Sequence, residues 1–206
     1  MRAMLPLLVI EAGRPIAPVL GATDAQGAGE GDLGGYGVVA ADITPGHAKL
    51  LLEAGTHPGK TVVRLDGMDA PLRWDKGKVR AVVPFSRIPL PSIEALRWEE
   101  VAWGRWLHKD HITLGEGRAT LKLLHIVASF AEAHDHILLS LEDNLALQGS
   151  WSKGRSPSGP LNFILRRRAA TCIAARITML LPWVQSPAMP ADELSRRQHA
   201  AHQGGP

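Results

Sequence analysis

The second half of the chain alternates strand-like apolar segments with longer amphipathic segments, and this alternation constrains the fold more than any other feature. Five strands are predicted, at residues 18–24, 35–42, 97–106, 136–144 and 177–184. Helices are predicted after the third, fourth and fifth strands, at residues 113–134, at 160–177 and directly after Pro190. Strands that alternate with helices favour a mixed sheet, so we expect an α/β fold with a mixed five-stranded sheet flanked by helices.

The segments outside this pattern mark the expected limits of the domain. Residues 1–16 are interrupted by prolines and are expected to be a lead-in or tether, whereas residues 199–206 form a polar tail that we expect to be disordered. The domain itself is predicted at residues 17–198. Residues 43–97, between the second and third strands, have weak structural signals and several prolines, so we expect an insert there.

The composition is typical of a folded protein in a reducing compartment. Hydrophobic residues make up 45% of the 206 residues and charged residues 21%, as in globular proteins. The single cysteine, Cys172, allows no internal disulfide, and the apolar run near the start lacks the cleavage site of a secretory signal. No segment approaches the roughly 20 apolar residues of a membrane span. We therefore expect an intracellular protein, cytoplasmic or nuclear and not secreted, without a membrane partner.

Basic residues gather in one part of the chain. The net charge is only +3, but no acidic residue lies between Lys153 and Arg176. The basic residues of this block are Lys153, Arg155, Arg166, Arg167, Arg168 and Arg176. A local block of this kind permits binding to the phosphates of nucleic acid.

Four carboxylates lie at the ends of apolar segments. Asp24 ends the first predicted strand and Asp143 the fourth, Glu116 lies in the first turn of a predicted helix, and Asp192 opens the last helix. In open α/β sheets the functional crevice lies beyond the strand ends, where such side chains can meet. Convergent carboxylates repel one another, and divalent cations relieve that repulsion. A pair of such cations can stabilise the attacking and leaving oxygens of a phosphodiester.

Each of these carboxylates also matches an ordinary structural role. Asp24 is a suitable turn residue beside a glycine-rich loop. Glu116, three residues after Thr113, matches a capping box that would only stabilise the helix start. Asp143 and Asp192 both stand where a helix begins and are suitable helix caps. The distances between the carboxylates decide between these roles and a shared metal site.

Four motifs together resemble a known family. They are TDAQGAGEGDLGGYGVV (23–39), GRWLHKDHITLGEGRATLKLL (104–124), LLSLEDNLALQGSWSKGRSPSGPLN (138–162) and PWVQSPAMPADELSR (182–196). In this order they resemble the ribonuclease H domain of the reverse transcriptases of retrotransposons, especially those of the tyrosine-recombinase type. The resemblance covers about residues 4–197 and is poor over the insert.

This resemblance implies a fold, an activity and a set of site residues. It implies a ribonuclease-H-like sheet and cleavage of the RNA strand of an RNA–DNA hybrid with two Mg²⁺ ions, or Mn²⁺ in their place. The metal ligands would be Asp24, Glu116, Asp143 and Asp192. Glu142 competes with Asp143 for the third position, and we prefer Asp143 because the family shows an Asp-Asn pair there. We assign nucleic-acid binding to Asn144, Trp151, Lys153, Arg155 and Arg166, with Trp151 stacking on a base or sugar.

The sequence also departs from the family pattern. The loop between Ile177 and Asp192 has no histidine, which implies slower catalysis, and Met189-Pro190 replaces the family's asparagine. No polymerase motif is visible, so we expect a fragment of a retroelement polyprotein, with an upstream reverse transcriptase domain as a partner. The alternatives are a degenerate domain that only binds nucleic acid, a related nuclease such as an integrase, transposase or exonuclease, and a structural α/β domain.

Overall fold

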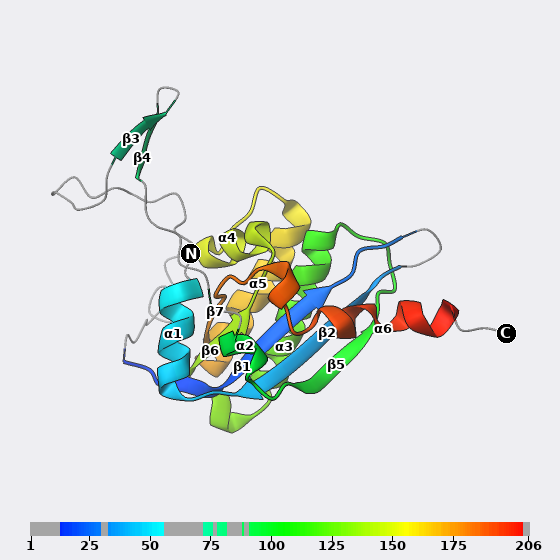
Figure 1. The fold of residues 1–206 in the computed structure, drawn as a ribbon, viewed down its shortest axis with the longest axis horizontal. Helices are drawn as coiled ribbons and strands as arrows, with labels where there is room; N and C mark the ends of the chain where they lie inside the picture. Colours follow the sequence, from blue (N-terminus) through cyan, green and yellow to red (C-terminus); the bar gives the residue numbers. More distant parts are fainter. Residues whose placement is uncertain are drawn as a thin grey trace.

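Five strands form one mixed sheet in the computed structural model, which describes residues 13–29, 33–55, 72–75, 78–81, 88 and 91–203 (Figure 1). The strands are β1 (Ile16–Ala25), β2 (Gly35–Asp42), β5 (Glu99–Arg105), β6 (Ile137–Leu141) and β7 (Thr178–Leu180), in the order β5-β2-β1-β6-β7. Strand β2 is antiparallel to β1 and β5, whereas β1, β6 and β7 are parallel. The predicted mixed five-stranded sheet is thus confirmed.

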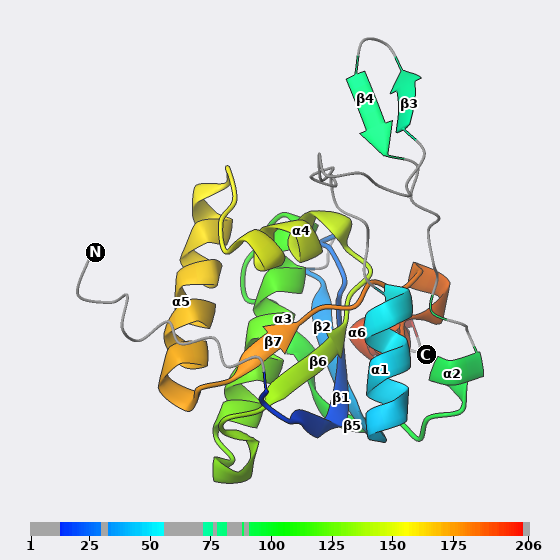
Figure 2. The ribbon, with the colours of Figure 1, turned by 90° about the vertical axis from the view of Figure 1, so that its left-hand side faces the viewer.

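Helices cover both faces of the sheet (Figure 2). One face carries α1 (Pro45–Gly55), α2 (Pro91–Glu94) and α6 (Asp192–Gln203). The other carries α3 (Ile112–Ala128), α4 (Leu145–Lys153) and α5 (Gly159–Ala175). Two short 3-10 helices, η2 (Ala131–Ala133) and η3 (Ser186–Ala188), lie in the connections. The helices therefore form a layer on each side of the sheet, as the α/β pattern predicts.

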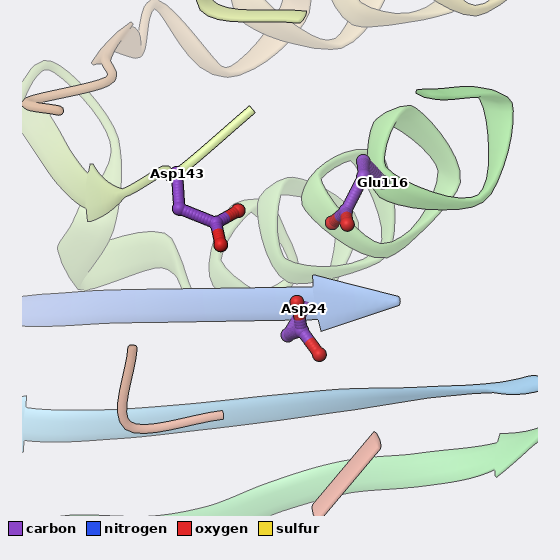
Figure 3. Close-up of side chains that lie close together, drawn as sticks. All are labelled: Asp24, Glu116 and Asp143. Carbon is purple, nitrogen blue, oxygen red and sulfur yellow. The ribbon is translucent and has the colours of Figure 1, made fainter. Parts of the chain in front are cut away.

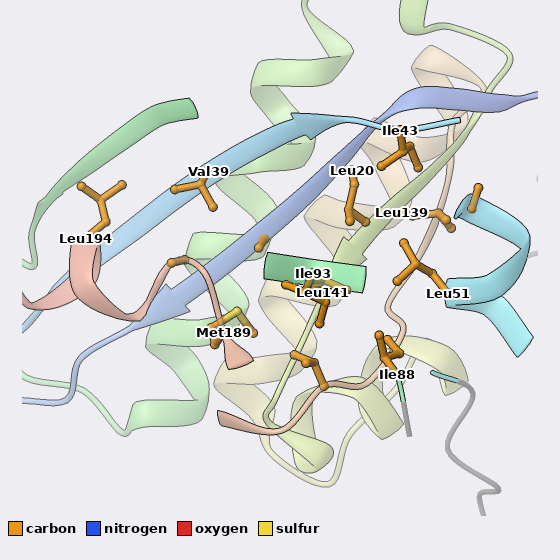
Figure 4. Packing of buried hydrophobic residues seen from close by; sticks show 14 residues of the cluster. Leu20, Val39, Ile43, Leu51, Ile88, Ile93, Leu139, Leu141, Met189 and Leu194 are labelled. Atoms are coloured by element: carbon orange, nitrogen blue, oxygen red, sulfur yellow. The ribbon is translucent and has the colours of Figure 1, made fainter. Parts of the chain in front are cut away.

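The side chains of the central strands β1, β2 and β6 alternate between two hydrophobic cores. Leu20 and Leu139 pack with Leu51 of α1 and Leu194 of α6 on one face (Figure 4). Val38 and Leu138 pack on the other face with buried leucines of α3, α4 and α5, namely Leu124, Leu147 and Leu165. Because successive strand residues point to opposite faces, the side chain of each residue in these strands is directed toward one core or the other.

The expected insert is only partly separate from the domain. Helix α1 and the segment around α2 supply Ala48, Leu51, Ile88 and Ile93 to the first core, so these parts of residues 43–97 belong to the domain interior. A separate hairpin consists of β3 (Leu72–Asp75) and β4 (Lys78–Ala81). The sequence pattern also favours a strand at residues 60–67, but that segment lies outside the described residues.

Some predicted boundaries differ from the structure. The helix predicted at 113–134 ends at Ala128, and the strand predicted at 177–184 is only three residues long, followed by an isolated bridge between Glu142 and Trp183. Helix α6 continues to Gln203, into the segment that we expect to be a disordered tail. None of the helices in the described part of the chain combines the length and the apolar character needed to cross a membrane.

Candidate metal centre

Three of the four predicted carboxylates meet at one edge of the sheet (Figure 3). Asp24 is near the end of β1, Asp143 follows β6, and Glu116 lies in the second turn of α3. Each offers one carboxylate oxygen, and these oxygens all lie within 4.8 Å of one another. Because β1 and β6 are parallel neighbours, their carboxyl ends share one edge, and α3 brings Glu116 to the same point.

Burial makes this cluster electrostatically costly without a cation. Asp24 is 6% exposed and Glu116 is 4% exposed. Burial raises the pKa of Asp24 to about 6, a hydrogen bond from Ser195 opposes this, and the charges of Asp143 and Asp192 add to it. Burial also raises the pKa of Glu116 to about 10, with further contributions from the charges of Glu142, Asp24 and Asp143.

The donor set fits a divalent cation such as Mg²⁺. Within the described residues, Glu116 Oε2 is buried and has no hydrogen-bond partner. An unpartnered buried carboxylate oxygen beside two other carboxylates would gain strongly from a cation. Carboxylate oxygens are also the ligands that Mg²⁺ prefers. Asp24, Glu116 and Asp143 are thus suitable ligands by chemistry as well as by position.

The structure excludes the ordinary roles of two of these residues. Asp24 lies inside β1, paired with Gly37 of β2, and is therefore not a turn residue. Helix α3 begins at Ile112, and His111 caps it by accepting a hydrogen bond from the Thr113 backbone N–H. The capping box from Thr113 to Glu116 is therefore absent.

Asp192 lies close to the cluster without joining it. Its Oδ1 is 2.6 Å from Arg196 Nη2, one turn further along α6. Its charge contributes to the raised pKa of Asp24, but its carboxylate is not among the three oxygen donors within 4.8 Å of one another. The structure therefore brings together three of the four predicted ligands, with the fourth held in an ion pair nearby.

Helix α6 contacts the site through Ser195, a residue that no sequence pattern marks as part of it. The Ser195 hydroxyl donates to Asp24 Oδ2 and also lies 2.9 Å from the Asp192 carbonyl oxygen. This contact requires a glycine in β2, because a Cβ on Gly37 would lie 2.7 Å from Ser195 N and 2.8 Å from Ala191 O. The glycines on both sides of Tyr36 were the available signal, since a glycine within a strand often marks a close backbone approach.

Glu142 points into the protein interior, whereas Asp143 contributes to the cluster. Glu142 is fully buried, and burial raises its pKa well above the ordinary value for glutamate. Its Oε1 accepts a hydrogen bond of 2.9 Å from the Asn144 backbone N–H. Asn144 in turn caps α4, with its side-chain oxygen accepting from the backbone N–H groups of Ala146 and Leu147. The helix cap at this position is therefore Asn144 and not Asp143.

The residues that we assign to nucleic-acid binding lie in different environments. Lys153, Arg155 and Arg166 are exposed, and Asn144 is half-buried. The prediction that Trp151 stacks on a nucleotide is wrong, because Trp151 is 1% exposed and packs in the second core. The Arg168 guanidinium lies 5.0 Å from the centre of its ring and donates to the Trp151 carbonyl oxygen. Both residues therefore hold α4 and α5 together.

No protein-family model matches the chain, and no curated protein matches it. Among solved structures, it is similar to a ribonuclease H1 isolated from compost by a metagenomic approach, with 10% identity over 88% of this chain and 97% of the other and a TM-score of 0.47. A crystal structure of that enzyme with an RNA/DNA hybrid gives the same identity and TM-score, with 89% and 99% covered. The ribonuclease H1 of Halobacterium salinarum NRC-1 is 12% identical over 89% of this chain and 98% of its own, with a TM-score of 0.44. Because these identities and TM-scores are low, the fold is assigned from the strand order and strand pairing of this chain.

Proposed function

We propose that the chain is a ribonuclease-H-like nuclease that cleaves the RNA strand of RNA–DNA hybrids by two-metal-ion phosphodiester hydrolysis. The convergence of Asp24, Glu116 and Asp143 is the observation that carries this proposal. Two of these residues are buried, and burial together with the neighbouring carboxylates raises their pKa values, so a bound cation would favour the ionised form of the cluster. The four sequence motifs support the choice of nuclease, and with it an origin in a retroelement with a reverse transcriptase domain as a partner.

Each carboxylate has a defined task in this proposal. Asp24, Glu116 and Asp143 would hold Mg²⁺ or Mn²⁺, and Asp192 would join them after separating from Arg196. Bound ions would supply an activated water and stabilise the charge that develops on the leaving oxygen. Ser195 keeps Asp24 in a fixed orientation through its hydrogen bond to Oδ2.

The exposed basic residues fit the backbone of the nucleic acid. Helix α4 begins directly after the Asp143–Asn144 pair and ends at Lys153, so its rise places Lys153 about 12 Å along the helix axis from Leu145. Arg155 follows in the next loop and Arg166 lies on α5. Their charges would neutralise phosphates and set the position of the duplex, whereas the ribose 2′-OH would distinguish RNA from DNA.

A second candidate function is a degenerate domain that binds hybrids without cleaving them. The ion pair between Asp192 and Arg196 favours this alternative, because it occupies the fourth predicted ligand. The missing histidine in the loop between Ile177 and Asp192 points the same way.

Cleavage of a labelled RNA–DNA hybrid in Mg²⁺ tests the proposal. We expect Asp24→Asn and Asp143→Asn each to lower the cleavage rate by about 10³-fold, because each removes charge that holds the cations. Asp42→Asn is the matched control: Asp42 is an exposed aspartate at the opposite end of the sheet, and its loss should leave the rate unchanged. Binding of the hybrid by the wild-type chain without any cleavage would select the degenerate domain, and absence of binding would contradict both functions.

A further inference from the structure

We propose that Glu142 and Trp183 are positioning residues that fix the direction of Asp143 toward the other two carboxylates. This inference rests on the proposed function, because it concerns the same metal centre. Neither side chain belongs to the carboxylate cluster, and both act on the backbone that carries Asp143.

The peptide that links Asp143 to Asn144 is held on both of its polar groups. Glu142 Oε1 accepts from the Asn144 N–H at 2.9 Å. The Trp183 indole N–H donates to the Asp143 carbonyl oxygen at 3.0 Å. A peptide plane with both its donor and its acceptor occupied by side chains has little freedom to rotate, so the carboxylate of Asp143 keeps its direction.

Glu142 also contacts the element that carries Glu116. Strand alternation directs Glu142 to the same face as Ser140 and Leu138, toward α3. There its Oε2 lies 3.4 Å from the Thr120 hydroxyl, which donates at 2.8 Å to the Glu116 carbonyl oxygen. The side chain of Glu142 thus joins the segment of Asp143 to the segment of Glu116.

Thr23 extends this connection to the third carboxylate. Its hydroxyl lies 3.0 Å from the hydroxyl of Thr120, and Thr23 is the residue before Asp24. Thr23, Thr120 and Glu142 are all fully buried. A buried polar group in each ligand-bearing segment therefore connects the segments beneath the metal centre.

Trp183 is itself fixed by the sheet. The Glu142 N–H donates to the Pro182 carbonyl oxygen at 3.1 Å, and the Val184 N–H donates to the Glu142 carbonyl oxygen at 3.0 Å. These two backbone bonds hold the residues before and after Trp183 against the end of β6. The indole N–H is thereby aimed at Asp143 by the backbone, and its contribution can be removed without changing the strand.

Metal affinity of the full chain tests the inference independently of cleavage. Mn²⁺ binding is measured from the loss of the free Mn²⁺ signal in electron paramagnetic resonance, together with the free energy of unfolding of each variant. Groups that orient metal ligands typically change affinity by 10–100-fold, so we expect about tenfold weaker Mn²⁺ binding for Trp183→Phe and for Glu142→Leu. Glu142→Gln keeps an acceptor oxygen for the Asn144 N–H and should stay within about twofold of the wild type.

Trp98→Phe is the matched control. The Trp98 indole N–H donates to the Ile93 carbonyl oxygen at 3.1 Å, away from the carboxylates, so this variant loses an equivalent bond but should keep the wild-type Mn²⁺ affinity. If Glu142→Leu fails to fold, the comparison between Trp183→Phe and Trp98→Phe decides the inference.

Three results would separate the possible failures. Wild-type affinity in both Trp183→Phe and Glu142→Leu would overturn the positioning role. A loss in Glu142→Gln as large as that in Asp143→Asn would show that Glu142 is itself a ligand, which also overturns it. Unchanged affinity in Asp143→Asn would instead contradict the proposed metal centre.

Discussion

The two ends of β1 are packed in opposite ways. At its carboxyl end, Asp24 lies opposite Gly37 of β2. The backbone of α6 is so close to Gly37 that a Cβ atom at this position would collide with it. At its amino end, Pro18 and Val19 border an apolar pocket of about 510 Å³, which Val127 and Phe130 also line. One strand therefore joins a tightly fitted polar region to a loosely filled apolar one.

The difference follows from the kinds of forces at each end. Carboxylates that share a cation must be held at fixed positions, and hydrogen bonds and close backbone contacts provide this because they are directional. Apolar burial is not directional, so the far end of the sheet tolerates unfilled space at a modest loss of stability. At the polar end the neighbouring atoms belong to the backbone of α6, whereas the apolar end borders a pocket.

The largest expected effect concerns the charge of the polar end. The folded-state pKa of Asp24, about 6, lies above its ordinary value of 3.8, so between these values the folded protein binds more protons than the unfolded one. The free energy of unfolding of the metal-free protein should therefore fall as the pH rises through this window, by about 3 kcal/mol for Asp24 alone. Glu116, with a pKa of about 10, extends the fall in the same direction to higher pH.

Urea unfolding between pH 4 and pH 8, with EDTA or with Mg²⁺, measures this effect. Mg²⁺ should restore stability at pH 8, because it binds the ionised folded cluster and not the unfolded chain. Asp24→Asn should reduce the pH dependence in EDTA. A metal-free protein that becomes more stable from pH 5 to pH 8 would contradict the electrostatic description of the site.

The next effect tests the close packing at the polar end. A Cβ at position 37 would lie 2.7–2.9 Å from Ser195 N, Ala191 O and Leu194 Cβ, so Gly37→Ala must displace α6. We expect a loss of about 3 kcal/mol in the free energy of unfolding, at the upper end for overpacking, because the obstacle is backbone. Chemical denaturation measures the loss, and Mn²⁺ affinity should fall with it because Ser195 moves away from Asp24.

The smallest effect concerns the same substitution in the middle of β1, where Gly21 borders the apolar pocket. Gly21→Ala would place a Cβ 2.2 Å from Leu123 Cδ2, a shorter contact than any at Gly37. Here the obstacle is the end of a flexible side chain that borders the pocket, so Leu123 can rotate into unfilled space. We expect a loss of only about 1 kcal/mol and unchanged Mn²⁺ affinity. A larger loss for Gly21→Ala than for Gly37→Ala would overturn the contrast between the two ends.

The sequence predicts the strands and the convergence of carboxylates better than it predicts the support beneath them. The strands at residues 18–24 and 35–42 are predicted correctly because each is a short apolar run, and its length and the glycine or acidic residue at its end favour a strand. The burial of Trp151 cannot be predicted locally, because its neighbours along the chain are basic and its burial depends on contacts with the distant helix α5. Ser195 acts through a hydrogen bond to Asp24, 171 positions away in the sequence, and no pattern around Ser195 predicts that contact. The sequence places Glu142 at the strand end but does not predict its hydrogen bond to the Asn144 backbone.

The hydrogen bond from Ser195 to Asp24 also has a consequence for the order in which the parts of the site form during synthesis. It joins residues 171 positions apart. A ribosome adds about 5–20 residues per second, so Asp24 is synthesised about 9–34 s before the serine that orients it. Glu116 and Asp143 are added within that interval, and α6 comes after all three. The carboxylate centre is therefore completed only after α6 has been synthesised and has packed against β2.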